Sequence, residues 1–294
     1  MSVETKKKEK LSATQVNMFL NCGAQWMFRY VEGIKTPPAM ALTFGTAVDK
    51  GLEHNFKQKI TSGQDETPDT VADVFVDTFD REIKNTVLAE DDDPAASREQ
   101  GVGLVRKYMQ EEAPPLQPKE GGVQEFIDLP LGEAFPYDYT TKLDLTTVDD
   151  LLIDHKTANK SPSRRCPKCG KTGQGDRFDC KECGSELKVE SDISNVGHQH
   201  QLISYSLAHE HRWGRPPKQV RIDYLIKTKE PKIMKGTMTV DDEDKRFWMN
   251  TVARVADGIQ KEVFIPNRGS MMCSKRWCGY WRQCEANWGG KVKP

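Results

Sequence analysis

The sequence predicts a domain of the α/β or α+β class. Two observations carry this prediction: several segments alternate apolar and polar residues, as half-buried strands do, and helical segments precede and follow them. The expected strands are 122–131, 139–148, 151–157, 220–228 and 232–240. The expected longer helices are 46–59, 71–88, 102–111, 199–213 and 242–262. Asp149 and Asp150 connect two strands so tightly that we expect a hairpin.

The N-terminal region predicts two short helices. Ser12 and Gln15 fit a capping box, in which Ser12 is the N-cap and the Gln15 side chain reaches back. The apolar stripe that follows brings Cys22 to the end of the first helix. A second helix around 26–30 should stop before the prolines at 37–38.

The segments between the helices are polar. We expect 61–69 to be a linker and the acidic run 90–94 to be a turn, with either a solvated surface or a metal-binding role. In the helix 46–59, Val48 and Leu52 fall on one face and Asp49 on another.

Composition excludes several classes of protein. The 294 residues are 36% hydrophobic and 30% charged, which is typical of a soluble globular protein and not of a disordered one. The N-terminus has no apolar segment of a secretory signal, and no apolar run approaches the roughly 20 residues that span a bilayer. We therefore expect a cytoplasmic protein with no membrane partner. Its eight cysteines are then reduced, which favours metal ligands over disulfides.

The net charge of −1 gives no general case for a polyanionic partner. Local charge is less even, because 211–235 holds eight Lys/Arg residues and 268–294 holds six. These stretches could face phosphates, although charged stretches are more often solvated surface.

The expected hairpin brings carboxylates together. Asp144 and Asp154 come from its two adjacent strands, and Lys156 points to the same side as Asp154. Carboxylate oxygens in such a place suit Mg²⁺ or Mn²⁺. Lys156 could then orient an attacking water or stabilise phosphate charge. The alternative is an ordinary Asp–Lys ion pair at the end of a strand.

These residues also resemble a known family. Asp144, the run 154–157 (DHKT) and the run 201–205 (QLISY) together resemble the PD-(D/E)XK nuclease superfamily, in its RecB-like exonuclease branch. That branch has an aspartate strand, a D-Y-K-T strand and a Q-x-x-x-Y helix. The run 44–53 (FGTAVDKGLE) resembles its G-T-x-x-H-x-x-L-E helix, and 12–30 its opening helix. The resemblance runs nearly end to end.

The resemblance implies a restriction-endonuclease-like core, with a central mixed sheet flanked by helices, in one RecB-like domain over 1–294. It implies that Asp49, Asp144 and Asp154 bind the metal, together with the backbone carbonyl of His155. Asp49 stands where the family has histidine, and His155 where it has tyrosine.

On the following helix, Gln201 and Tyr205 share one face, four residues apart. There they could hold Lys156 or DNA and so support the site. Alternatively, they are an ordinary packing pair.

Four cysteines lie near the two ends of the chain. Cys22 stands alone, whereas Cys273, Cys278 and Cys284 cluster with four and five intervening residues. This resembles the iron–sulfur subset of RecB-like nucleases, which includes AddB-type helicase-nucleases and the CRISPR-associated adaptation nuclease. The resemblance implies a [4Fe–4S] cluster that joins the chain ends. The first spacing departs from the family's usual two residues, which leaves zinc, no metal or buried free thiols as alternatives.

The other four cysteines form two C-x-x-C-G knuckles ten residues apart, Cys166/Cys169 and Cys180/Cys183. Paired knuckles of this kind predict a Cys₄ zinc ribbon, inserted over 162–190 between the lysine strand and the Gln201 helix. Its role could be DNA contact, partner contact or stabilisation. We interpret the flanking His198 and His200 as surface or core residues and not as ligands.

From these residues and the resemblance we expect a Mg²⁺- or Mn²⁺-dependent deoxyribonuclease. The family resemblance implies an exonuclease on DNA ends, single-stranded or duplex, with single-stranded DNA favoured. It would act in recombination, repair or phage DNA processing in a bacterial or phage-infected cell. The chain has no G-x-x-x-x-G-K-[ST] motif, so any unwinding requires a partner helicase or recombination protein. The alternative is a non-catalytic DNA-binding or recombination-accessory module.

Overall fold

The structure is a computed structural model, and it describes residues 9–133, 135–161, 164–166, 168–169, 171–173, 179–185 and 195–294. The chain forms two compact units. Unit 1 comprises Met1–Thr36, Ile127–Thr141 and Asp241–Pro294, and unit 2 comprises Pro37–Phe126 and Lys142–Val240. Among the described residues, no helix combines the length and the apolarity needed to cross a bilayer.

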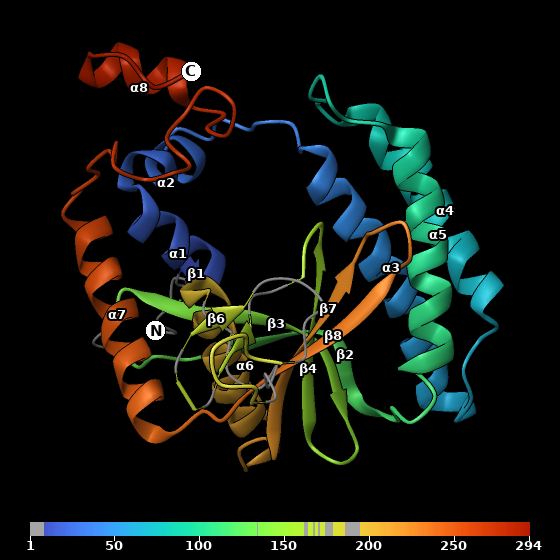
Figure 1. Ribbon diagram of the computed structural model, residues 1–294. Helices are drawn as coiled ribbons and strands as arrows, with labels where there is room; N and C mark the ends of the chain where they lie inside the picture. The colour runs from blue at the N-terminus through green and yellow to red at the C-terminus, as the bar shows by residue number, and fades with distance from the viewer. Residues whose placement is uncertain are drawn as a thin grey trace, which may run out of the picture. The chain divides into compact units, whose positions relative to one another are not determined.

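A mixed sheet forms the centre of unit 2 (Figure 1). Its strands are β3 (Tyr137–Thr147, of which the second half lies in unit 2), β4 (Leu151–Ala158), β7 (Gln219–Ile226) and β8 (Lys232–Met238). β4 pairs antiparallel with β3 and parallel with β7, and β7 pairs antiparallel with β8. β2 (Pro118–Leu129) pairs with β3. The five predicted strands are therefore present, and the predicted α/β fold with a mixed sheet flanked by helices is confirmed.

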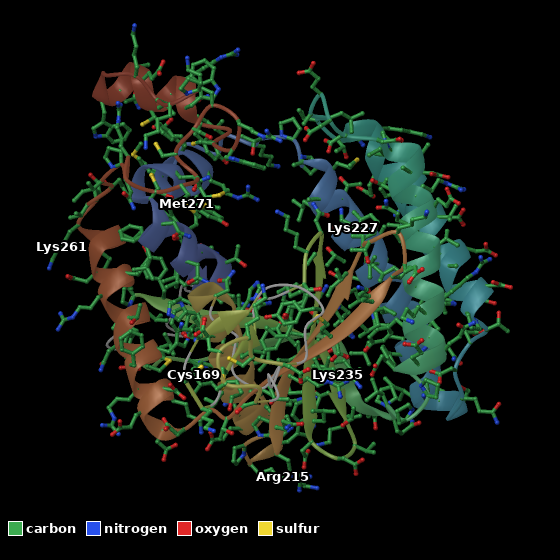
Figure 2. The ribbon with its side chains drawn as sticks, viewed as in Figure 1. Cys169, Arg215, Lys227, Lys235, Lys261 and Met271 are labelled. Carbon is green, nitrogen blue, oxygen red and sulfur yellow. The ribbon has the colours of Figure 1, made fainter. Side chains whose placement is uncertain are left out.

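The predicted hairpin between β3 and β4 is also confirmed. Its register pairs Leu145 with Ile153, and the turn residue Asp150 has a left-handed backbone with φ of 61°. The buried Asp150 carboxylate forms ion pairs with Lys119 and, at 2.8 Å, with Arg215, which Figure 2 labels. These contacts anchor the turn and so keep the two strands in register.

Helices cover the sheet of unit 2. They are α3 (Met40–Ser62), α4 (Pro68–Glu82), α5 (Pro94–Glu111) and α6 (Val196–Trp213), and the short 3₁₀ helix η1 (Ile83–Asn85) follows α4. Helix α3 contacts β4, α5 contacts β7 and β8, and α6 contacts β4 and β7. Two short strands, β5 (Arg164–Arg165) and β6 (Thr172–Gly173), pair antiparallel with each other near the cysteine knuckles.

Several predicted helix limits were wrong, for local reasons. Thr67 caps α4 and Pro68 occupies its first turn, so the linker predicted over 61–69 is shorter. Helix α4 ends at Glu82 and not at residue 88, because Thr86 turns extended after η1. Asp93 caps α5 with Pro94 after it, so this helix begins eight residues earlier than residue 102. The acidic run before it is a turn, as predicted.

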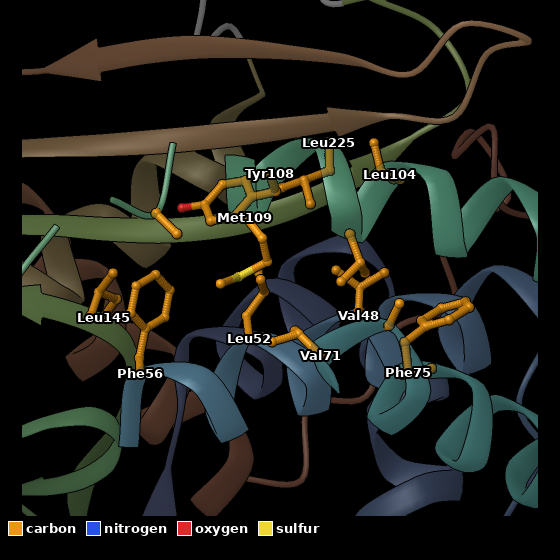
Figure 3. Packing of buried hydrophobic residues seen from close by; sticks show 14 of the residues in the cluster. Val48, Leu52, Phe56, Val71, Phe75, Leu104, Tyr108, Met109, Leu145 and Leu225 are labelled. Carbon is orange, nitrogen blue, oxygen red and sulfur yellow. The ribbon is translucent and has the colours of Figure 1, made fainter. Parts of the chain in front are cut away.

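The core of unit 2 lies between α3, α4, α5 and the sheet. Figure 3 shows side chains of the three helices that belong to one hydrophobic cluster with Leu145 of β3 and Leu225 of β7. Val48 and Leu52 are fully buried in it, as their spacing predicts. This packing fixes α3 and α5 against the strands that carry the polar residues described below.

Unit 1 contains four helices among its described residues, α1 (Ala13–Asn21), α2 (Gly23–Tyr30), α7 (Asp242–Gln260) and α8 (Trp281–Trp288). The short strand β1 (Glu9–Leu11), which we did not predict, pairs parallel with the first residues of β3. Ser12 caps α1 by accepting the Gln15 amide N–H at 3.4 Å. The expected return bond is wrong, because the Gln15 side chain donates instead to the Lys10 carbonyl.

Two glycines of α5 provide a matched test of the core. A Cβ at Gly101 would overlap the ring of Phe75, which is fully buried, whereas a Cβ at Gly103 would meet only Pro231 at 3.5 Å. We expect Gly101→Ala to lower the free energy of unfolding by about 1–3 kcal/mol because the core is overpacked. Gly103→Ala should leave it unchanged or raise it by up to about 1 kcal/mol. Urea unfolding followed by circular dichroism measures both, and equal stability of the two variants would contradict this packing.

Candidate active site

Asp144 of β3 lies directly beside the backbone of β4. Its Oδ2 accepts a hydrogen bond from the His155 backbone N–H at 3.0 Å. The ladder of β3 with β4 is described only as far as Leu145 and Ile153, so the Asp144 carboxylate bonds the strand just beyond that pair. Asp144 and Asp154 therefore come together at the end of the hairpin, as predicted.

Asp154 and Lys156 lie on the same side of β4 and form an ion pair. Lys156 Nζ donates to Asp154 Oδ1 at 2.8 Å. Oδ2 is also 2.8 Å from Nζ, but within the described chain it has no hydrogen bond of regular geometry. Asp154 is 1% exposed. Burial lowers the pKa of Lys156, but Asp154 and Asp144 raise it more, so it stays above its usual value and the side chain is an ammonium.

Asp49 joins these groups from helix α3. Its pKa is raised to about 8, first by burial and then by the Asp144 carboxylate, with a further contribution from Asp154. Lys156 opposes this rise. Such electrostatic interactions require the groups to be near one another. The helix thus adds a third carboxylate beside those of the two strands.

Gln201 and Tyr205 of α6 are linked to Asp144. Gln201 Nε2 donates to the Tyr205 hydroxyl at 2.8 Å, and that hydroxyl donates to Asp144 Oδ1 at 3.4 Å. Burial and the nearby carboxylates raise the pKa of Tyr205 well above its usual value, so the hydroxyl keeps its proton and remains a donor. The hydrogen bond that the structure describes from this pair to the carboxylates therefore goes to Asp144.

The His155 side chain points to the opposite face of β4, into the core. Its ring stacks on Phe56, and its Nε2 lies 2.9 Å from the Tyr108 hydroxyl. Tyr108 donates to Asp223 Oδ2 at 2.9 Å, and Arg221 donates to the same oxygen at 2.8 Å. Burial lowers the pKa of His155 to about 4, which keeps the imidazole neutral.

Sequence reasoning missed this buried network, and it missed other residues near the carboxylates. Gln124 of β2 donates to Asp144 Oδ1 at 3.4 Å, and Lys142 of β3 lowers the pKa of Asp49 by its charge. His198, which we interpreted as a surface or core residue, is partly buried. Burial lowers the pKa of its imidazole, and the charge of Lys156 lowers it further. Period-two patterns place Lys142 beside Asp144, but no pattern in the chain indicates Gln124.

The donor set of the three aspartates fits a hard divalent cation such as Mg²⁺ or Mn²⁺. The carboxylate oxygens of these three residues are farther apart than the sulfur atoms of the four knuckle cysteines. Within the residues that the structure describes, only one set of three or more His, Cys, Asp or Glu has its ligand atoms all within 4.8 Å, and that set consists of cysteines.

That set is Cys166, Cys169, Cys180 and Cys183, as the paired knuckles predict. The Sγ atoms of Cys166 and Cys183, and of Cys169 and Cys180, are each 3.5 Å apart. Figure 2 labels Cys169. The backbone N–H groups of Cys166 and Cys180 bond to the carbonyls of residues 171 and 185, each at 2.8 Å, and so close each knuckle. Of the ribbon predicted over 162–190, residues 162–163, 167, 170, 174–178 and 186–190 lie outside the described residues.

The other four cysteines gather in unit 1. Cys22, Cys278 and Cys284 pack in one cluster with Phe28 and Tyr280. Burial raises the pKa of Cys278, and electrostatic interactions with the other three thiols, Cys273 among them, raise it further. Cys22 Sγ accepts the Asn267 backbone N–H at 3.5 Å. Cys22 and the three C-terminal cysteines therefore lie near one another in unit 1.

The buried network behind β4 yields a test. Tyr108→Phe removes the hydroxyl that serves both His155 and Asp223 and leaves two buried polar groups short of a partner. We expect the free energy of unfolding to fall by about 1–3 kcal/mol. Tyr30→Phe, at an exposed tyrosine of α2, is the control and should change it by less than about 0.5 kcal/mol. Denaturant unfolding compares the two, and a Tyr108→Phe variant as stable as the control would contradict the network.

Comparison with solved structures supports the fold. A protein from Eubacterium rectale, described as a "putative exonuclease", matches with a TM-score of 0.59 at 14% identity, over 97% of this chain and 90% of its own. A second structure, SSO0001, reaches a TM-score of 0.41 at 9% identity over 96% and 89% of the two chains, which is too low to support an argument.

A search of curated proteins found no match. The family model of the PD-(D/E)XK nuclease superfamily matches residues 10–285. This range includes Asp49, the hairpin with Asp144 and Asp154, and the helix with Tyr205. The chain therefore belongs to the PD-(D/E)XK nuclease superfamily.

Proposed function

We propose that this protein is a Mg²⁺- or Mn²⁺-dependent deoxyribonuclease that hydrolyses phosphodiester bonds at DNA ends. The observation that carries this proposal is that Lys156 pairs with Asp154 at 2.8 Å and that the Asp144 carboxylate bonds the adjoining His155 N–H at 3.0 Å. Asp49 interacts electrostatically with Asp144, Asp154 and Lys156. An ion pair at a strand end would need only Asp154 and Lys156. Two further carboxyl groups on other elements cost energy through burial and, when ionised, through repulsion, and a divalent cation offsets this cost.

Each residue has a role in this proposal. Asp144, Asp154 and Asp49, with the His155 backbone carbonyl, would hold the cation. Such a cation polarises the phosphate and lowers the pKa of water. Lys156 orients the attacking water or stabilises phosphate charge. Tyr205, held by Gln201, donates to Asp144 and so keeps its carboxylate in position.

The substrate is proposed from similarity. The Eubacterium rectale protein is described as a "putative exonuclease", and the motifs resemble the RecB-like exonuclease branch. We therefore propose exonuclease action on DNA ends, mainly of single strands, in recombination, repair or phage DNA processing. The setting is the cytoplasm of a bacterial or phage-infected cell, and a helicase or recombination protein supplies any unwinding.

Lys156→Ala tests this function. With labelled single-stranded DNA and Mn²⁺, we expect wild type to release nucleotides and the variant to be at least about 100-fold slower, because the charge beside the reacting phosphate is lost. Chelation with EDTA should abolish cleavage. Lys261→Ala, at an exposed lysine directly after α7 that Figure 2 labels, is the control and should match wild type. Equal rates for Lys156→Ala and wild type would overturn the proposal.

A non-catalytic DNA-binding or recombination-accessory module is the second candidate. The observation in its favour is Asp49, which stands where the family has histidine and whose pKa of about 8 leaves it largely protonated at neutral pH without a cation. Binding of DNA without cleavage by both wild type and Lys156→Ala would favour this alternative.

We further propose two metal centres held by thiolates. Zn²⁺ at Cys166, Cys169, Cys180 and Cys183 is supported by the closeness of the four Sγ atoms. A [4Fe–4S] cluster at Cys22, Cys273, Cys278 and Cys284, as in the AddB-type branch, is supported by the meeting of these residues in unit 1. In this proposal the nuclease domain contains an inserted zinc ribbon, and the iron–sulfur cluster joins its N-terminal and C-terminal segments.

Metal analysis of anaerobically purified protein tests both centres. We expect about four irons and one zinc per chain. Cys169→Ser should lower zinc and leave iron, whereas Cys278→Ser should remove iron and the visible absorbance and leave zinc. Each variant is the control for the other. Two zincs and no iron in wild type would contradict the iron–sulfur assignment.

A further inference from the structure

Phe126 is a large aromatic side chain that remains in solvent near the candidate active site. It lies on β2, and 68% of its surface is exposed. Exposed aromatic residues are common singly and need no explanation by themselves. The residues around Phe126, however, connect it to the carboxylates of the candidate active site.

Lys142 connects Phe126 to the carboxylates. Its ammonium lies 5.6 Å from the centre of the Phe126 ring. Lys142 precedes Asp144 by two residues on β3, so the two side chains leave the strand on the same face. Its charge also reaches Asp49, where it lowers the pKa. The ring and the ammonium are therefore at the margin of the carboxylate cluster.

Gln124, which lies on β2 with Phe126, also connects this strand to the carboxylates. It has a φ of 52°, in the left-handed region that residues other than glycine seldom adopt. Such a conformation costs of order 1 kcal/mol or more and persists only where surrounding contacts hold it. Here the Gln124 amide donates to Asp144 Oδ1 at 3.4 Å. This distortion of β2 directs Gln124 to Asp144, two residues before Phe126.

The charges around Phe126 favour a phosphate-bearing ligand with a flat apolar part. The carboxylates by themselves repel phosphate, whereas the positive charges of Lys142 and Lys156 both act on Asp49. An aromatic face beside an ammonium suits a nucleotide, because the base stacks on the ring while the phosphate pairs with the cation. Bases inside a duplex already stack on each other and do not offer a free face.

We propose that Phe126 and Lys142 form a binding site for one unpaired nucleotide of a DNA strand, next to the phosphodiester at the carboxylates. The base stacks on Phe126, and Lys142 pairs with its phosphate. This proposal rests on the nuclease function proposed above and deepens it, because the site selects single-stranded DNA at the position beside the cleaved bond.

The test is binding of a labelled single-stranded oligonucleotide in EDTA, measured by fluorescence anisotropy. Phe126→Ala should weaken binding roughly 5- to 150-fold, the range for loss of one base–aromatic stack. Phe126→Trp keeps an aromatic face and should bind like wild type. Phe247→Ala is the matched control, at a phenylalanine of α7 that is 63% exposed, and should not change binding. Binding of a blunt duplex should be equal in all four proteins.

Lys142→Gln provides a second measurement. It should reduce the slope of log affinity against log salt by about 0.7, the value for one phosphate contact on a single strand. Phe126→Ala should leave that slope unchanged. Equal single-strand affinity of Phe126→Ala and wild type would overturn the proposal, and so would an equal loss of affinity for the duplex.

The outcomes separate this proposal from the nuclease function. If wild type cleaves DNA with Mn²⁺ and Phe126→Ala binds as wild type does, the stacking site fails and the nuclease stands. If wild type binds single strands through Phe126 but never cleaves, the catalytic function fails and the nucleotide site stands.

Discussion

Strand β4 has to place an imidazole and an ion pair in opposite environments within three consecutive residues. Alternation of side chains across the strand achieves this, since His155 enters the core while Asp154 and Lys156 leave on the other face. A shift of the strand by one residue would bury the charges and expose the imidazole, which is costly. The core contacts of His155 with Phe56 and Tyr108 therefore also hold the two charged residues in register.

Asp144 is the point at which separate parts of unit 2 meet. Its carboxylate accepts hydrogen bonds from the β4 backbone, from Gln124 of β2 and from Tyr205 of α6. Donors of this kind stabilise the charged form of a carboxylate. Gln124 has a strained backbone with a positive φ, and the Tyr205 side chain is buried. Structural cost concentrated on one carboxylate is typical of functional sites.

The two groups of four cysteines differ in how they are assembled. The knuckle pairs are local, because short loops closed by backbone hydrogen bonds bring each pair together. The other group joins residues more than 240 positions apart, Cys22 and the C-terminal three, and depends on the packing of α2 against the segment around Tyr280. The first arrangement is readable from spacing, whereas the second required the resemblance.

The sequence by itself determined the strands, the hairpin, most helices and the residues of the motifs, because alternation, caps and turn residues act over a few neighbours. Asp144, Asp154 and Lys156 could be brought together on this basis, since one hairpin carries them. Only the tertiary structure decided that the Tyr108 hydroxyl contacts both His155 and Asp223. It also decided that Asp49 interacts with the carboxylates of the hairpin and that Gln124 donates to Asp144. Those contacts depend on which strand lies beside β4 and on how α3 and α5 pack, and local patterns do not contain that information.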